Sequence, residues 1–412
     1  MKRLLDINSK ITIKRDTLGD ILCFCTGILA LSAVGSLFYT SIHLPYLPEL
    51  FFIPLVLFYK GTKHRIKLKP TRGFLIILSL ELISIVLGVL NTSGDIYGVV
   101  TCGRPFVYLT IIGFYYSRDY SKPIPLDLLY LLCLGAQFGE FFGKYFDSAY
   151  SSVNSIDHIN WLSMSVMIFI PTVRKNQKQL VFSIIVGLIN SVFSFYRRIM
   201  VFYIASIAIV ILYKTIKTKS FKRFAYLIPV SGLVYFVYVK LEQIIERLTS
   251  VLHIDYSLFE ARFIKKFRAM FNNEVTVSDQ VRLNTYNDIK ENFMANTIPN
   301  GPIGKSMDIN SYFGRYTDTP LTYIIDFFGS IGAVIVLVFV AFKAIKCFLI
   351  ALFKDNLDET YTICALMTPL LLVSLIIDGA FLVHLNYAFV TGYCISGWFF
   401  SDRKIRGFTK NG

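Results

Sequence analysis

The feature that most constrains this chain is a series of long apolar runs, separated by short connectors rich in lysine and arginine. Many of the runs approach the roughly 20 residues that an α-helix needs to cross a bilayer. The chain is 54% hydrophobic and only 17% charged, whereas soluble domains carry about 25% charged residues. The sequence therefore predicts an all-α, polytopic membrane protein.

The lengths of the runs predict about twelve transmembrane helices. In chain order, the runs cover residues 21–42, 44–59, 74–92, 97–116, 126–146, 160–173, 179–195, 199–213, 224–239, 320–342, 361–379 and 382–400. No Ser- or Pro-rich linker separates them, so we expect one integral membrane domain over residues 1–412. The number of spans depends most on the short second and sixth runs, because merging either with a neighbour would move every later loop across the membrane.

The positions of lysine and arginine predict the orientation of the spans. Cytoplasmic connectors carry an excess of these residues, and here the N-terminal segment, alternate connectors and the C-terminal segment are basic. Both termini are therefore expected to be cytoplasmic. The long polar segment 240–319, between the ninth and tenth spans, is then expected to be a single large loop of short helices on the opposite side of the membrane.

Several functional classes are disfavoured by the same sequence. The net charge of +15 is spread over short connectors that orient spans, so nucleic acid is not expected as a partner. The seven cysteines lie in or beside apolar runs without metal-ligand spacing, which predicts small buried residues instead of disulfides or metal ligands. Carboxylates occur singly on the outward-facing side, and no nucleotide-binding loop is present. We therefore expect no metal and no cofactor.

Within the large loop, one helix is expected to begin at Ser278, a good N-cap, and to run to about Ala295. This helix carries Arg282 and Tyr286 along one side. The Gly and Pro residues in segment 299–304 then interrupt the helix.

Three arginines outside the basic connectors are candidates for binding a substrate. Arg104 lies inside the fourth apolar run, and the pair Arg197 and Arg198 lies on the outer side, where basic residues are disfavoured. An arginine within a spanning helix costs about 2.5–3.5 kcal/mol, so it usually has a partner or a task. The structural alternatives are snorkelling to lipid headgroups or ion pairs with a carboxylate (Asp95, Glu140 or Asp147).

The functional alternative is that these arginines hold a phosphate or pyrophosphate. Arginine offers fixed, bidentate donors to phosphate oxygens and stays protonated. Several arginines facing one compartment could bind a lipid pyrophosphate-linked sugar and stabilise the pyrophosphate as a leaving group. A nearby carboxylate or imidazole would then accept the proton of the attacking hydroxyl.

The order of these features resembles that of the Wzy-type O-antigen polymerases and the related O-antigen ligases. The resemblance covers about residues 191–340 and rests on three stretches, which read SFYRR, DQVRLNTYNDIKENFMANTIPNGPIG and DTPLTYIIDFFGSIGAV. It implies a glycosyltransferase of the GT-C type in the bacterial inner membrane, with the large loop in the periplasm. Undecaprenyl-pyrophosphate-linked oligosaccharides would be the substrates, and a chain-length regulator protein a further partner. By this resemblance, Arg197 or Arg198 and Arg282 would contact the pyrophosphate. Arg104 and Tyr286 are further candidates for binding substrate, taken from their places in the sequence.

One departure from the family affects the expected base. The ligases and many polymerases have a His-Asn near the start of the helix that re-enters the membrane, and here that position reads Thr317-Asp318-Thr319-Pro320. Asp318 would replace the histidine as base or cap the helix at Pro320, and Asp326 is the next candidate.

The missing histidine favours a polymerase over a ligase that transfers finished polymer to lipid A-core. The non-enzymatic alternative is a lipid-linked oligosaccharide flippase. The single large loop disfavours that alternative, because such transporters typically have two similar halves and short loops.

Overall fold

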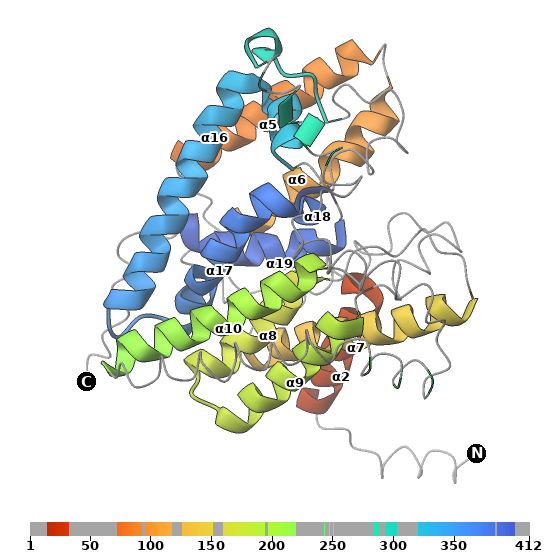
Figure 1. The fold of residues 1–412 in the computed structure, drawn as a ribbon. Helices are drawn as coiled ribbons and strands as arrows, with labels where there is room; N and C mark the ends of the chain where they lie inside the picture. The colour runs from red at the N-terminus through yellow and green to blue at the C-terminus, as the bar shows by residue number, and fades with distance from the viewer. Residues whose placement is uncertain are drawn as a thin grey trace, which may run out of the picture.

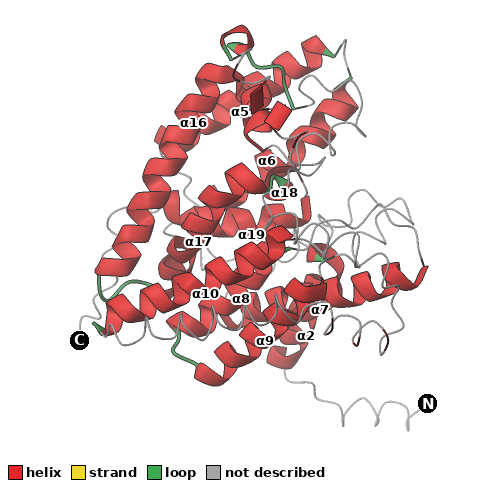
Figure 2. Cartoon of the chain, in the orientation of Figure 1, coloured by secondary structure: helices red, strands yellow, loops and turns green. Residues whose placement is uncertain are grey.

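The computed structural model describes residues 15–32, 72–92, 95–117, 126–150, 160–193, 197–219, 293–302, 320–383 and 385–399, with isolated positions between 243 and 290. Every regular element within these residues is helical, and no strand occurs among them (Figure 2). The predicted all-α class is therefore confirmed for the described part of the chain.

Six of the described helices are long and apolar enough to cross a membrane. They are α5 (Arg72–Asn91), α6 (Ile96–Tyr116), α7 (Leu126–Tyr150), α10 (Arg197–Thr218), α16 (Pro320–Phe353) and α17 (Glu359–Ile377) (Figure 1). Each predicted apolar run except 44–59 and 224–239 contains a described helix, and those two runs lie outside the described residues. The full set of twelve spans stays a prediction.

The remaining helices are shorter than a span. They are α2 (Arg15–Leu31), α8 (Trp161–Val173), α9 (Gln177–Phe193), α18 (Ala380–Val383), α19 (Leu385–Ile395), and the 3₁₀ turns η3 (Met294–Asn296) and η4 (Ser396–Phe399). The predicted single run 382–400 thus consists of short pieces. Most of the large loop lies outside the described residues, and its position across the membrane stays a prediction.

The short helix α8 is at the centre of the bundle. Every side chain from Trp161 to Thr172 is buried, and α8 packs against α7, α9, α10, α17 and α19. A helix that is apolar on all sides is stable only when surrounded by other elements. Its 13 residues extend only about 20 Å, which is shorter than the roughly 30 Å hydrocarbon core of a bilayer, and neighbouring helices cover its side chains.

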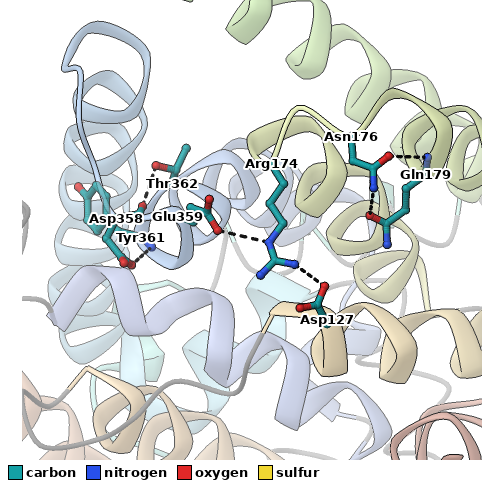
Figure 3. Close-up of polar contacts among 8 residues, drawn as sticks. All are labelled: Asp127, Arg174, Asn176, Gln179, Asp358, Glu359, Tyr361 and Thr362. Carbon is teal, nitrogen blue, oxygen red and sulfur yellow. Dashed lines mark hydrogen bonds and ion pairs between the residues drawn. The ribbon is translucent and has the colours of Figure 1, made fainter. Parts of the chain in front are cut away.

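Ion pairs mark one end of the bundle, which we call the Arg174 end. Arg174, directly after α8, pairs with Asp127 of α7 and lies 3.3 Å from the carboxylate of Glu359 at the start of α17 (Figure 3). Lys217 of α10 lies 3.2 Å from Asp355, before α17. Because the three carboxylates are exposed to solvent, each pair contributes little stability, but together the pairs show which helix ends lie side by side.

A kink in α16 forms the docking site of the segment 293–302. Gly329 has φ 70° and ψ 163°, a backbone conformation that is almost exclusive to glycine. The break frees the carbonyls of the preceding turn for other donors. The carbonyl of Asp326 accepts the backbone N–H of Asn300 at 2.8 Å, and that of Phe327 accepts the hydroxyl of Ser84 from α5.

The docked segment, which we call the 293–302 turn, lies against α5, α6 and α16 (Figure 1). Pro302 and Gly301 pack on Gly88 of α5, and Pro302 also packs on Gly103 of α6. The side chain of Asn91 donates weakly to the carbonyl of Asn300, at 3.4 Å. The predicted interruption of the loop helix by Gly and Pro is thus confirmed up to Pro302, and the interruption docks within the bundle instead of lying free above it.

Candidate functional site

A buried polar cluster lies at the end of the bundle opposite to the Arg174 end. The helices α8 and α10 begin there and α17 ends there, since the other end of each helix takes part in the ion pairs described above. We call it the Arg198 cluster, and its members are Glu140, Trp161, Arg198, Asp378 and Tyr387. These residues come from α7, α8, α10, the residue after α17, and α19.

The centre of the cluster is an ion pair between Arg198 and Asp378. The guanidinium Nη1 lies 3.4 Å from Oδ1 of Asp378, and the two side chains are only 12% and 1% exposed. The indole Nε1 of Trp161 donates a hydrogen bond to the other carboxylate oxygen, Oδ2, at 2.9 Å. The Trp161 ring in turn stacks on Phe202 of α10, with centroids 3.8 Å apart and planes at 5°. Both oxygens of Asp378 are thus engaged by fixed donors.

A second carboxylate, that of Glu140, lies in the same region and is fully buried. Its Oε1 accepts the backbone N–H of Asn160 at 3.2 Å, and Asn160 caps α8 by accepting the N–H of Ser163. Gln137 of α7 donates to the carbonyl of Asn160 at 3.1 Å. The start of α8 is therefore fixed to α7 by hydrogen bonds, and these bonds also define the position of Trp161, the first residue of α8.

Tyr387 completes the cluster from α19. Its side chain is fully buried, and Asp378, Glu140 and Arg198 all lie within electrostatic range of its hydroxyl. The cluster thus joins two carboxylates, one guanidinium and one phenol in the interior of the helix bundle. Burying such groups is costly unless they are paired, and ionisable residues inside membrane bundles usually mark functional sites.

The large loop contacts the bundle next to this cluster. The hydroxyl of Tyr286 donates to the carbonyl of Ile376 at 2.9 Å, and Ile376 lies in the last turn of α17, two residues before Asp378. The described residues between 280 and 290 have helical backbone, which confirms the predicted loop helix at those positions. Arg282 precedes Tyr286 by four residues in the sequence, and its predicted place on the same face of that helix lies outside the described residues.

Two predicted site residues are bound to or lie beside the 293–302 turn. Asp326 is buried, and its Oδ1 accepts a hydrogen bond from the side chain of Asn300 at 3.2 Å, in addition to the backbone bond described above. These contacts give Asp326 a part in anchoring the turn, and its catalytic role stays a prediction. Arg104 is half-buried on α6, next to Gly103, which contacts Pro302.

For the other predicted site residues, the structure describes at most the backbone. Arg197 is the first residue of α10, but its side chain, like those of Arg282 and Asp318, lies outside the described residues. The structure therefore brings Arg198 and the Tyr286 contact to the end of α17, while Asp326 and Arg104 are near the docked turn.

Sequence reasoning missed three members of the cluster, Trp161, Asp378 and Tyr387. For the unusual arginines it considered Asp95, Glu140 or Asp147 as ion-pair partners and did not consider Asp378, which forms an ion pair with Arg198. Asp95 instead caps α6 by accepting the N–H of Gly98 at 2.9 Å. The available signal was that Asp378 lies inside the apolar run 361–379, where a carboxylate is rare.

All seven cysteines are free thiols. Six of them are buried as predicted, whereas Cys25 is exposed, so the prediction of a buried residue is wrong at that position. Among the described residues, no group of three or more His, Cys, Asp or Glu side chains is arranged to hold a metal ion.

Comparison with known proteins gives no matching family model, no matching curated protein and no matching solved structure.

Proposed function

We propose that this chain is a membrane glycosyltransferase of the O-antigen polymerase type, which joins undecaprenyl-pyrophosphate-linked repeat units on the periplasmic face of a bacterial inner membrane. The observation that carries the proposal is Arg198, whose side chain is 12% exposed and pairs with the buried Asp378 at the same end of α17 that the loop helix contacts through Tyr286. A guanidinium held among the helices of the bundle, together with an Arg282 in the same loop as Tyr286, suits an amphipathic lipid with a pyrophosphate headgroup.

In the proposed reaction, the growing glycan is transferred from its own lipid carrier to the end of a new unit. A hydroxyl oxygen of the acceptor sugar attacks the anomeric carbon of the donor glycan, and the bond from that carbon to the pyrophosphate oxygen breaks. The pyrophosphate leaves with the bonding electron pair, and arginine side chains stabilise its negative charge. A carboxylate accepts the hydroxyl proton, and Asp318 and Asp326 are the candidates from the sequence.

The direct test is the lipopolysaccharide ladder of a strain that lacks this chain. We expect single repeat units attached to lipid A-core, with the long-chain ladder restored by a plasmid copy. A normal ladder without the plasmid would contradict the proposal. Polymer retained on its carrier lipid would instead indicate a ligase, and lipid-linked units that accumulate on the cytoplasmic face would indicate a flippase.

Arg282→Lys is expected to reduce polymerisation about tenfold or more. Lysine keeps the positive charge but loses the bidentate geometry, and a hydrogen bond to a charged group contributes about 1.5–3 kcal/mol, where 1.4 kcal/mol is a factor of ten in rate. The measurement is chain-length distribution at matched protein abundance. Arg247→Lys is the matched control, since Arg247 is an exposed residue of the same loop. Unchanged chains in Arg282→Lys would remove Arg282 from the site.

A further inference from the structure

The part played by Asp378 follows from how its carboxylate is held. One oxygen lies against the guanidinium of Arg198 and the other accepts the indole N–H of Trp161. Taking up a proton would weaken one of these charge-assisted contacts, and the side chain is almost inaccessible, at 1% exposure. The geometry therefore suits an orienting group much better than a proton acceptor.

Trp161 is itself held rigidly, so the orientation of Asp378 is defined by the fold. Its ring is fully buried and stacks on Phe202, and it follows directly after Asn160, which is hydrogen bonded to α7 through Glu140 and Gln137. Arginine has high rotamer entropy, and ordering it at the moment of binding would weaken affinity. A carboxylate that orders the guanidinium in advance removes part of that cost.

We propose that Asp378, held by Trp161, is a positioning residue that orients Arg198 toward the pyrophosphate of the lipid-linked substrate. The inference rests on the proposed function, because it assumes that Arg198 meets a pyrophosphate. When that anion binds, the guanidinium is shared between Asp378 and a phosphate oxygen. The hydrogen bond from the Trp161 indole to Asp378 then changes, so Trp161 reports on occupancy of the site.

The chain offers a simple optical test, because it contains only two tryptophans, Trp161 and Trp398. In a Trp398→Phe background, the emission of Trp161 is followed while the full-length protein in lipid nanodiscs is titrated with undecaprenyl pyrophosphate. Undecaprenyl monophosphate serves as the control lipid. We expect a saturable change in emission with the pyrophosphate lipid, and a much weaker response with the monophosphate.

Variants then separate positioning from binding. Asp378→Asn keeps the shape but loses the charge, and we expect it to weaken undecaprenyl pyrophosphate binding about tenfold, with partial recovery in Asp378→Glu. Where Asp378→Asn does not fold, Trp161→Phe decides, because it removes the indole donor while keeping an aromatic ring that can stack on Phe202. For Trp161→Phe we expect weaker binding of the radiolabelled lipid in a filter assay.

The failures of the two proposals are distinguishable. Binding that is lost in Arg198→Ala but unchanged in both Asp378→Asn and Trp161→Phe would overturn the positioning role and leave the proposed function standing. A wild-type protein that does not bind undecaprenyl pyrophosphate at all would overturn both. A change in Trp161 emission that is equal for the monophosphate and pyrophosphate lipids would also overturn the inference, since it would not depend on the second phosphate.

Discussion

Asp378→Ala is expected to destabilise the protein by about 3–5 kcal/mol, which is the usual cost of removing one partner from a buried ion pair. The variant leaves the guanidinium of Arg198, only 12% exposed, without its carboxylate, and it removes the acceptor of the Trp161 indole N–H. The measurement is the free energy of unfolding in detergent micelles titrated with a denaturing detergent, followed by helical circular dichroism.

A double variant tests the reason for this loss. Replacing both charged groups by apolar side chains (Arg198→Met with Asp378→Leu) is expected to recover most of the lost stability, because neither member of the ion pair is then left without the other. The same variant is expected to be inactive in polymerisation, since the guanidinium is absent. A double variant as unstable as Asp378→Ala would contradict the ion-pair explanation and indicate that packing at the end of α17 dominates.

Local patterns in the sequence predicted several of the described helices closely. The fourth run was expected over 97–116 and α6 covers Ile96–Tyr116, with Asp95 as its N-cap. The sixth run, expected over 160–173, is α8 (Trp161–Val173). Such helices can be read from the sequence because a spanning or buried helix satisfies its own backbone hydrogen bonds, and its length and apolar composition depend on neighbouring residues alone.

The course of α16 was not predicted, because other parts of the chain determine it. The tenth run was expected to end at residue 342, yet the helix continues to Phe353 past Lys343 and Lys346, whose long side chains can extend from a helix to polar surroundings. The kink at Gly329 was also not expected, since glycine is common in straight membrane helices. The docked 293–302 turn occupies the space that a side chain at Gly329 would need.

Only part of the candidate site could be predicted from the sequence, because residues far apart in the chain form it. Arg198 stood out because it breaks the local charge bias, which is a property of neighbouring residues. Its partner Asp378 and the indole that holds Asp378 are 217 residues apart in the chain, and no local pattern relates them. The sequence thus identifies Arg198 as exceptional. Why the bundle tolerates Arg198 can be explained only from the packing of α8, α10 and α17, which brings Asp378 and Trp161 to it.

The second prediction with a large expected effect concerns Gly301 in the docked 293–302 turn. Gly301→Ala is expected to prevent the 293–302 turn from docking, because a Cβ at Gly301 would lie 2.2 Å from the Cα of Gly88, and backbone atoms of α5 cannot move aside as a side chain can. The positive φ of 95° adds a strain of about 1–2 kcal/mol for any residue with a Cβ. Undocking would also remove both hydrogen bonds between Asn300 and Asp326.

Two measurements check this prediction. In limited proteolysis of the protein in detergent, Gly301→Ala is expected to be cleaved within the turn at least about tenfold faster than wild type, because cleavage follows the population of the opened segment. Polymer chains are expected to shorten towards single units, because the turn links the Tyr286 helix to α16. Met294→Ala is the control, since Met294 lies in the same segment and is 79% exposed. Rapid cleavage with normal polymer length would show that the loop works without its anchor on α16, and would restrict the site to the Arg198 end of the bundle.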